Sequence, residues 1–263
     1  IMNLKILKEK IFDLKNLTVD ETSFIFDLIM TGKISEIEMS AILISLKIKS
    51  ETKEEILGAT LCMREKSLKI NTEEDTVDTC GTGGDMSGTL NISTSAAIVA
   101  ASAGIKVAKH GNRSISSKSG SADMLEKLSY KILDNPSEIE KSLKKNNFCF
   151  LFAQYHHSAM KHVGNVRKLL GTRTIFNLLG PLTNPANANK QLLGVYDKKW
   201  VKIHCEVLKE LGSKHALVVH GNDGLDEISL SGVTHISELK NEKIIQYIFD
   251  PKDYDYEYIK NSE

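Results

Sequence analysis

The sequence lacks an excess of charge of either sign and lacks any long hydrophobic run. Its 263 residues include 34 Lys and Arg and 34 Asp and Glu, so the formal net charge is zero. A protein that wraps nucleic acid would show a strong basic excess, so the balance argues against that class. No stretch approaches about 18 continuous apolar residues, and the N-terminus lacks a signal-peptide pattern. We therefore expect a soluble cytoplasmic protein that does not enter a membrane.

The cysteines lack the spacing of a disulfide framework or of a zinc site. The four of them are scattered, with no CxxC motif: Cys62, Cys80, Cys149 and Cys205. They are therefore predicted to be buried free thiols in a reducing compartment. The chain is long enough to bury a sizeable core and to form one large or two smaller domains.

Residues 1 to about 71 have the pattern of consecutive helices. Three capping boxes of the form S/T-x-x-E mark helix starts, at Thr18/Glu21, Ser35/Glu38 and Thr52/Glu55. Gly32 is placed to end the first of these helices. One apolar helix face is predicted from the spacing of Ile37, Ala41, Ile44, Leu46 and Ile48.

From about Thr76 the pattern changes to alternating strands and helices, which indicates parallel βαβ units. Strands are predicted at 76–80, 105–109, 148–152, 191–196 and 215–219. A further capping box, Ser137/Glu140, starts one of the intervening helices. Thr234–Leu239 and Lys243–Phe249 are predicted to form a late hairpin. Trp200 and the apolar residues after it (Val201, Leu208 and Leu211) are predicted to belong to the core.

The residues between Val77 and Leu125 are rich in glycine and hydroxyl side chains. The strand at 76–80 runs into the glycine turn Gly81-Thr82-Gly83-Gly84-Asp85, whose backbone amides can form an anion-binding concavity. A helix from Asn91 to Ala103, closed by Gly104, presents its positive N-terminus to the same region. Met86 excludes the dinucleotide fingerprint and Thr89 excludes a Walker A motif. A plain glycine turn before a buried helix is the alternative interpretation of this first piece.

Two more polar segments follow strands. Lys109-His110-Gly111-Asn112-Arg113-Ser114 comes after the strand at 105–109, and serines up to Ser121 extend it. Open α/β sheets bind ligands at the carboxyl ends of their strands. Asp226-Glu227 follows the strand at 215–219 and offers the hard oxygen ligands that Mg²⁺ prefers. Taken alone, this pair is more simply explained as a solvated acidic turn.

These segments closely resemble the anthranilate phosphoribosyltransferase family of tryptophan biosynthesis. The resemblance is carried by GTGGD, NIST, KHGNRS and SGSAD, by the segment from His156 to Gly171, by RTIFNLLGPLTNP at 173–185 and by GLDE at 224–227. Ser158 stands where the family often has Pro, and Thr172 where an apolar residue is common. Members usually continue for several tens of residues beyond this chain's last residue, and this sequence begins at Ile1 rather than Met.

The resemblance implies a small all-helical domain and a large α/β domain with a mainly parallel central sheet, with a cleft and hinge between them. The small domain would comprise 1–71, completed by about 160–187, and the large domain 72–159 and 188–263. The implied reaction transfers the phosphoribosyl group of phosphoribosyl pyrophosphate to the amino group of anthranilate. The product is N-(5-phosphoribosyl)anthranilate, pyrophosphate leaves, and the step is the second of tryptophan biosynthesis from chorismate.

The resemblance also implies the site residues, position by position. Phosphoribosyl pyrophosphate would be held by Gly81, Gly84, Asp85, Thr89, Asn91, Ile92, Ser93, Thr94, Lys109, His110, Gly111, Asn112, Arg113, Ser114, Ser116, Ser117 and Ser121. Anthranilate would contact Gly81, Asn112 and Arg167, and one or two Mg²⁺ ions would be held by Ser93, Asp226 and Glu227. His110 is a candidate for positioning rather than for general-base catalysis. A homodimer is implied, and association or fusion with a glutamine amidotransferase of anthranilate synthase is possible.

Two rival functions are left open. A pyrimidine nucleoside phosphorylase shares this fold and would use inorganic phosphate and a nucleoside, but its glycine turn differs. A non-catalytic nucleic-acid-binding relative would need a basic groove and no magnesium carboxylates. His156, His157 and His162 lack the i, i+4 spacing of a helical metal site, so helix-packing or substrate-tunnel roles are favoured.

Overall fold

The computed structural model describes residues 2–83, 91–113 and 120–259. The chain divides into two compact units. The helical unit comprises residues 1–68 and 154–183, and the α/β unit comprises residues 69–153 and 184–263.

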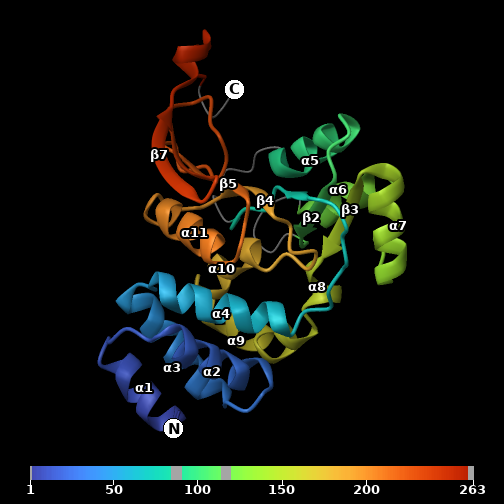
Figure 1. Ribbon diagram of the computed structural model, residues 1–263. Coiled ribbons are helices and arrows are strands. Elements are labelled where there is room, and N and C mark those ends of the chain that lie inside the picture. Colours follow the sequence, from blue (N-terminus) through green and yellow to red (C-terminus); the bar gives the residue numbers. More distant parts are fainter. Residues whose placement is uncertain (1, 84–90, 114–119, 260–263) are drawn as a thin grey trace. The chain divides into compact units, whose positions relative to one another are not determined.

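The helical unit contains the four N-terminal helices, drawn in blue in Figure 1, and several shorter ones. Their bounds are α1 Leu4–Phe12, α2 Val19–Met30, α3 Glu36–Lys49, α4 Lys53–Glu65, α8 Ala153–His156, η1 Ser158–His162, α9 Gly164–Leu170, α10 Phe176–Leu179 and η2 Gly180–Leu182. All three predicted capping boxes are confirmed at the starts of α2, α3 and α4. Gly32 follows the C-cap of α2 with φ +70°, as a helix-ending glycine should.

The predicted apolar face of α3 is wrong by a fraction of a turn. The buried residues are Met39, Ile42, Leu43 and Leu46. They follow the i, i+3, i+4, i+7 spacing that lines up side chains on one face. Of the predicted set only Leu46 is buried, whereas the side chains of Ile37 and Ile48 are 83% and 70% exposed. Because apolar side chains occur on several sides of this helix, the sequence pattern alone does not predict which side is buried.

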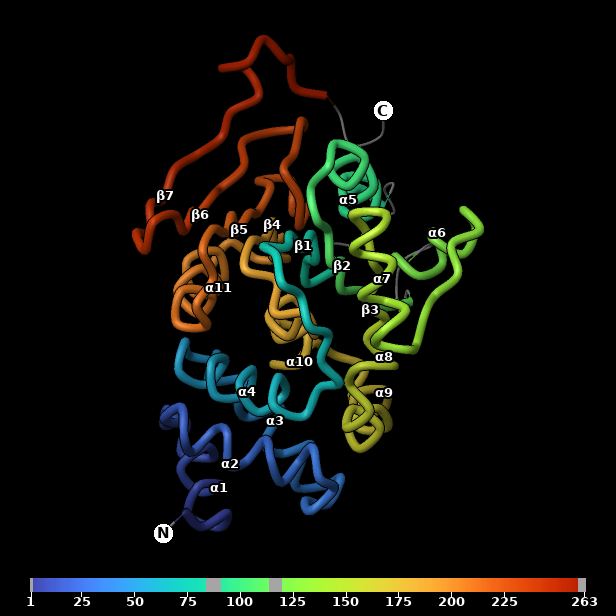
Figure 2. Tube along the Cα trace, turned by 45° about the vertical axis from the view of Figure 1, so that its right-hand side comes forward, coloured from blue at the N-terminus to red at the C-terminus, as the bar shows by residue number. Residues whose placement is uncertain are grey.

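The α/β unit is built on one sheet, whose strands in the described residues have the order β3-β2-β1-β4-β5-β6-β7 (Figure 2). The strands are β1 Val77–Asp78, β2 Val107–Gly111, β3 Phe148–Phe152, β4 Lys190–Gly194, β5 His215–Gly221, β6 Thr234–Lys240 and β7 Lys243–Phe249. The pairings from β3 across to β5 are parallel, and β6 and β7 add an antiparallel hairpin. The predicted mainly parallel sheet and the late hairpin are confirmed.

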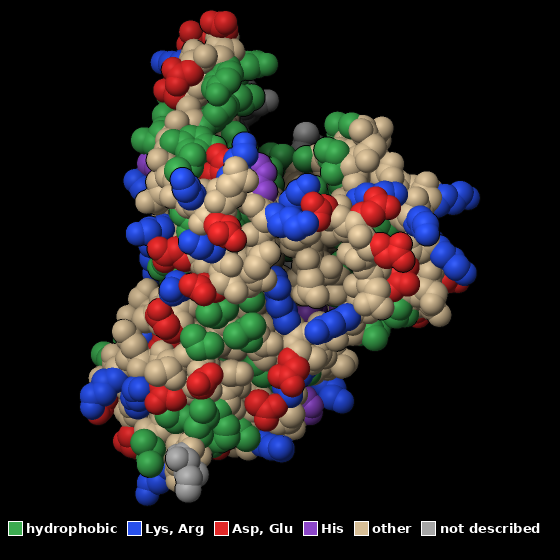
Figure 3. All heavy atoms as spheres, in the orientation of Figure 1, with side chains coloured by type: hydrophobic (Ala, Val, Ile, Leu, Met, Phe, Trp, Pro, Cys, Tyr) green, Lys and Arg blue, Asp and Glu red, His purple; other side chains and the backbone are tan. Residues whose placement is uncertain are grey.

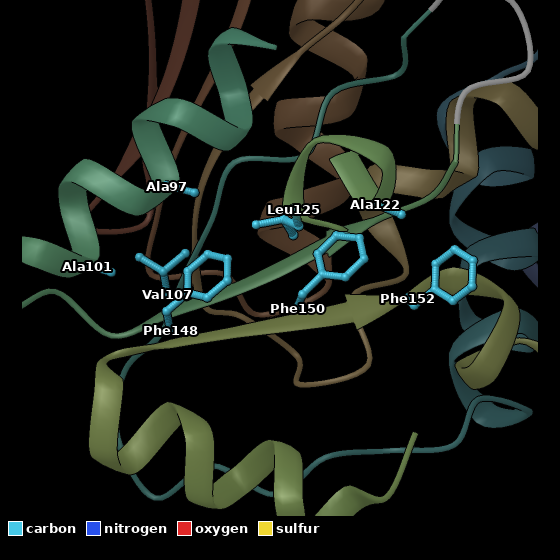
Figure 4. Packing of buried hydrophobic residues seen from close by; sticks show 8 residues of the cluster. All are labelled: Ala97, Ala101, Val107, Ala122, Leu125, Phe148, Phe150 and Phe152. Carbon is cyan, nitrogen blue, oxygen red and sulfur yellow. The ribbon is translucent and has the colours of Figure 1, made fainter. Parts of the chain in front are cut away.

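Helices cover both faces of β3, since its side chains alternate between two apolar clusters. Phe148, Phe150 and Phe152 point toward α5 (Ile92–Ser102) and α6 (Ser121–Lys127), as Figure 4 shows for the eight residues of that cluster. Cys149 and Leu151 belong to the other cluster, with α7 (Pro136–Asn146). The first cluster anchors α5, and therefore fixes where the N-terminus of that helix lies.

Two helix predictions in the α/β unit have different outcomes. The capping box Ser137/Glu140 is wrong: the N-cap of α7 is Asn135, two residues before Ser137, and its side chain accepts from the Ser137 and Glu138 amides. Asn outcompetes Ser here because Pro136 is preorganised for the first helical position. The core prediction for α11 (Lys199–Glu210), which packs on β5 and β6, is confirmed for Trp200, Val201 and Leu208.

The boundaries between units differ from the predicted 71, 159 and 187 by a few residues, and hydrogen bonds account for the difference. His156 belongs to the helical unit because its carbonyl accepts from the Leu68 amide at 2.8 Å and its ring Nδ1 lies 2.7 Å from the Leu68 carbonyl. Asn184 belongs to the α/β unit because its side-chain amide donates to Asp78 and to the Ala108 carbonyl.

The described surface mixes charges of both signs. On the face shown in Figure 3, acidic and basic side chains are interspersed, in keeping with the equal numbers in the sequence. Hydrophobic side chains gather over the end of the α/β unit formed by β7 and the residues after it, where Ile245, Ile248 and Tyr254 are more than half exposed. Within the described residues, no helix has the length and apolar character to cross a bilayer.

Candidate functional site

The glycine turn lies at the carboxyl end of β1, beside the end of β4 and the loop that follows β5. The Thr82 amide donates to the Gly194 carbonyl at 2.9 Å, and the Thr82 hydroxyl accepts from the Tyr196 amide at 3.0 Å. The Gly83 amide donates to Asp226 Oδ2 at 2.7 Å. The predicted site residues Gly84, Asp85 and Thr89 lie outside the described residues.

The loop that carries Asp226 approaches β4 too closely for a side chain to fit between them. A Cβ on Gly194 would lie 1.5 Å from the Asp226 carbonyl oxygen, and one on Gly81 would lie 2.8 Å from Asp226 Oδ2. Both positions therefore require glycine for reasons of space. This close packing brings a carboxylate from the loop after β5 onto the turn after β1.

The N-terminus of α5 is fixed by side-chain hydrogen bonds on both sides. Asn91 caps the helix by accepting from the Thr94 amide at 3.2 Å. The Thr94 hydroxyl donates to the Ser121 hydroxyl at 3.0 Å, and the Thr79 hydroxyl donates to the Ser93 carbonyl at 2.8 Å. The start of this helix thus presents backbone amides, hydroxyls and a partial positive charge, which together favour phosphate. Ile92, also predicted to contact the substrate, is 39% exposed there.

The side chain of Lys109 is buried behind this helix start, only 1% exposed. Its Nζ donates to the carbonyl and the hydroxyl of Thr79, at 3.2 and 3.1 Å, and to the Ser93 hydroxyl at 3.4 Å. The resemblance implied that this lysine is among the residues that hold phosphoribosyl pyrophosphate. Its observed position supplies positive charge from beneath the helix start.

Asp78 and Asn184 form a buried pair that sequence reasoning did not include in the site. Asp78 Oδ1 accepts from the His110 amide at 3.1 Å, and Oδ2 accepts from Asn184 Nδ2 at 2.7 Å. Burial raises the pKa of Asp78 to about 6, against the opposing effects of the Lys109 charge and of these donors. The available signal was an acidic residue inside a predicted strand, three positions before the glycine turn.

The segment after β2 presents a mixture of exposed and paired groups. Asn112 is exposed, and its side-chain oxygen accepts from the Arg113 amide at 2.8 Å. The Arg113 guanidinium makes two bonds of 2.6 Å to Glu126 and one of 3.1 Å to Asp123, which raise its pKa. Ser114, Ser116 and Ser117 lie outside the described residues.

The acidic pair Asp226-Glu227 is held in a compact loop rather than in a solvated turn. Asp226 is 9% exposed and Glu227 is half-buried. Asp223 braces the loop by accepting from the Leu225 amide at 3.2 Å and from the Ser229 hydroxyl at 2.5 Å. Two carboxylates of this kind, with the Ser93 hydroxyl, are a set of hard oxygen donors that suits Mg²⁺.

A second group of possible metal ligands lies deeper in the α/β unit. Ligand atoms of Asp78, Cys80 and His110 lie within 4.8 Å of one another. Both oxygens of Asp78 already accept hydrogen bonds, and burial raises the pKa of the Cys80 thiol strongly. This group is therefore poorly suited to bind a cation.

In the helical unit, Arg167 lies on α9, with its guanidinium 5.8 Å from the centre of the Phe176 ring. Burial lowers its pKa, so the charge is incompletely solvated. His156 and His157 are 1% and 5% exposed, and the ring of His162 lies beside Gly32. His156 and His157 are thus buried in the helical unit, which agrees with the helix-packing role, one of the two that were expected.

The fold and the site define a glycosyl transferase with a helical-bundle domain and an α/β domain. Residues 5–67 match the model of the glycosyl transferase family helical bundle domain, and residues 73–261 match that of the glycosyl transferase family a/b domain. More particularly, the chain belongs to the anthranilate phosphoribosyltransferases, which are pentosyltransferases.

Similar proteins span most of the chain. The chain is 46% identical to the anthranilate phosphoribosyltransferase of Hydrogenovibrio crunogenus, over 100% of this chain and 78% of that protein. It is 50% identical to that of Petrotoga mobilis, over 93% and 72%. The crystal structure of the Thermus thermophilus enzyme superposes with a TM-score of 0.90 at 37% identity, covering 97% of this chain and 76% of that chain. The Saccharomyces cerevisiae enzyme, in complex with phosphoribosyl pyrophosphate and Mg, gives 0.88 at 30%, covering 99% and 77%.

Proposed function

We propose that this chain transfers the phosphoribosyl group of phosphoribosyl pyrophosphate to the amino group of anthranilate, with release of pyrophosphate. The observation that carries the proposal is the contact of Asp226 with the Gly83 amide at 2.7 Å. It joins a candidate metal carboxylate to the glycine turn, beside an α-helix whose N-terminus favours phosphate.

The residues of the α/β unit would act on the pyrophosphate end. The amides of the α5 start and the hydroxyl of Ser93 would donate to the phosphate oxygens, with Thr94 beside them. The glycine turn, whose Thr82 and Gly83 amides are already engaged, would let the ligand approach closely. Ser93, Asp226 and Glu227 would hold one or two Mg²⁺ ions, which supply charge stabilisation to the leaving pyrophosphate when bound. The buried ammonium of Lys109 adds positive charge behind them.

Arg167 would bind the carboxylate of anthranilate, because a guanidinium can form two parallel hydrogen bonds with a carboxylate. Asn112 and Gly81 would contact the same substrate. The aromatic amine is neutral near pH 7, so a dedicated general base is unnecessary, and His110 has a positioning role. Holding amine and sugar together can supply about 7–11 kcal/mol of the barrier in a loose, oxocarbenium-like displacement.

The chain is also proposed to form a homodimer in the cytoplasm, and association or fusion with a glutamine amidotransferase is part of the same expectation. A cytoplasmic location is supported by the four cysteines, which are all free thiols. Light scattering of the purified chain tests the dimer, and co-purification tests the amidotransferase.

The experiment that tests the reaction combines the protein with Mg²⁺, phosphoribosyl pyrophosphate and anthranilate, and follows anthranilate fluorescence. A decay that requires all three components is expected. Phosphorolysis of a pyrimidine nucleoside with inorganic phosphate, without that decay, would instead identify a nucleoside phosphorylase.

A further inference from the structure

Asp78 lies where it can shape the phosphate site without touching a ligand. It is the last residue of β1 and its side chain is 0% exposed. Its neighbours come from separate segments of the α/β unit: β2 supplies the His110 amide, and the segment before β4 supplies Asn184. A buried carboxylate that accepts two directed hydrogen bonds has a fixed orientation, so it can fix its neighbours in turn.

The charge of Asp78 complements that of Lys109. The Lys109 side chain is 1% exposed, and the acceptors that its ammonium contacts are neutral oxygens of Thr79 and Ser93. A buried ammonium is costly without an opposite charge nearby. Attraction to Lys109 lowers the pKa of Asp78, against the stronger effect of burial. Asp78 is therefore a buried opposite charge near this lysine, whose Nζ contacts Thr79, the residue that follows Asp78.

Lys109 in turn contacts the start of α5. Its Nζ donates to the Ser93 hydroxyl, and the Thr79 hydroxyl donates to the Ser93 carbonyl. Ser93 lies in the first turn of α5, where backbone amides are available to an anion. A carboxylate in β1 is in this way linked to the helix start through a single buried side chain.

We propose that Asp78 is a positioning residue for the pyrophosphate end of the substrate, which holds Lys109 and, through it, the Ser93 turn in their binding arrangement before the substrate arrives. The assignment to pyrophosphate rests on the proposed function. Asp78 makes no contact with the reacting atoms and acts through Lys109. Asp78→Asn removes this charge and also replaces one acceptor oxygen by an NH₂ donor, so the hydrogen bonds from His110 and Asn184 cannot both keep their geometry.

The test compares Asp78→Asn with a matched control, Asp75→Asn. Both changes remove one carboxylate from the same segment, but Asp75 is exposed and pairs with Lys190 and Lys214 at the surface. In Asp78→Asn, the KM for phosphoribosyl pyrophosphate is expected to rise about 10- to 100-fold, as is typical when the partner of a ligand-binding group is removed. The KM for anthranilate should stay within about twofold. Asp75→Asn should change neither. Equal changes of both KM values in Asp78→Asn would overturn the proposal, since a general loss of structure acts on both substrates.

A double-mutant cycle with Lys109→Met tests whether Asp78 acts through the lysine. Calorimetric titration with Mg²⁺ and inorganic pyrophosphate is the readout, so it does not depend on turnover. In the Lys109→Met background, Asp78→Asn is expected to weaken binding by less than about threefold. A further loss of about tenfold or more would show independent action and overturn the proposal.

The double-mutant cycle also gives a result if Asp78→Asn alone fails to fold. The double variant removes both buried charges together, which proteins tolerate better than removal of one. If the double variant folds and Asp78→Asn alone does not, the pyrophosphate affinity of the double variant is compared with that of Lys109→Met. The same limits apply: a loss of less than about threefold supports the proposal, and a loss of about tenfold or more overturns it. Absence of turnover in the unchanged chain would refute the proposed function alone, because pyrophosphate binding is measured separately.

Discussion

Replacement of Gly194 by Ala is expected to abolish activity while leaving the chain folded. The added methyl group would lie 1.5 Å from the Asp226 carbonyl oxygen, whereas ordinary contacts begin at 3.4 Å. Because the obstacle is backbone, the loop must retreat by about 2 Å, which breaks the 2.7 Å bond from the Gly83 amide to Asp226 Oδ2. A displacement of about 1 Å in a catalytic group can cost about 100-fold, so kcat/KM should fall by at least that factor. Overpacking should lower the free energy of unfolding by only about 1–3 kcal/mol.

The matched control is Gly232→Ala in the same loop. A Cβ at Gly232 would meet its nearest neighbour, Asn222, at 3.9 Å, and the residue has no positive φ, so the change should be neutral. Anthranilate fluorescence measured across a Mg²⁺ titration gives the activity, and urea unfolding gives the stability. If Gly194→Ala retained activity within about threefold of the Gly232→Ala variant, the loop would be more compliant than this reasoning allows.

Four further predictions concern individual groups. Arg167→Ala should raise the KM for anthranilate about 10- to 100-fold, because it removes hydrogen bonds to a charged carboxylate. The KM for phosphoribosyl pyrophosphate should stay nearly unchanged. Equal increases of both KM values would contradict the role of Arg167 in binding the carboxylate. Asp226→Asn with Glu227→Gln should abolish Mg²⁺-dependent turnover with the fold intact by circular dichroism, and turnover retained at low Mg²⁺ would remove the pair from the site. In calorimetry, Mg²⁺ should bind more tightly in the presence of pyrophosphate than alone. The ammonium of Lys109 lies beside Ser93 and repels the cation, and the negative charge of pyrophosphate offsets that repulsion. Equal affinities with and without pyrophosphate would disprove this coupling. Burial, and then the charge of His156, lower the pKa of His157 to about 4, so the unfolded chain takes up the proton first as pH falls below about 6.5. The contribution of His157 to stability should be constant above that pH and fall by up to about 3 kcal/mol toward pH 4. Because burial raises the pKa of Asp78 to about 6, Asp78 contributes in the opposite direction over this range. The measurement is therefore the difference in urea unfolding between the unchanged chain and His157→Gln at each pH, and a difference that does not vary with pH would contradict the prediction.

Local sequence signals were sufficient where a few adjacent residues determine the structure. Capping boxes such as Thr18/Glu21 gave the starts of three helices, since the bonds that define them join residues three apart. The order of the strands and the parallel arrangement followed from the alternation of strands and helices. The bounds were less accurate: β1 is only Val77–Asp78, against 76–80 predicted, and β2 is Val107–Gly111, against 105–109. The buried side of α3 could not be predicted in this way. Ile37 and Met39 are both apolar, and only contacts with distant helices select the buried one.

The site shows the same division between local and long-range information. Glycine and hydroxyl patterns located the turn after β1 and the start of α5. No local pattern predicted that Asp226 accepts from the Gly83 amide, because the two residues are 143 positions apart. Asn184 is a similar case. Its motif was assigned to the helical domain, yet its side chain binds Asp78, 106 positions away.

The electrostatic arrangement of the site explains why its ligand should bind together with a metal ion. Arg113 is already engaged with Glu126, and the buried ammonium of Lys109 already donates to Thr79 and Ser93. The Gly83 amide is occupied by Asp226. Arg113 and Lys109 therefore attract an incoming polyphosphate less than cations without partners would, and Asp226 and Glu227 repel it. A divalent ion held by the two carboxylates, as proposed, would reverse that repulsion and make them the groups that anchor the ligand. In that role Asp226 and Glu227 would confer selectivity for a metal-bound polyphosphate over a free anion.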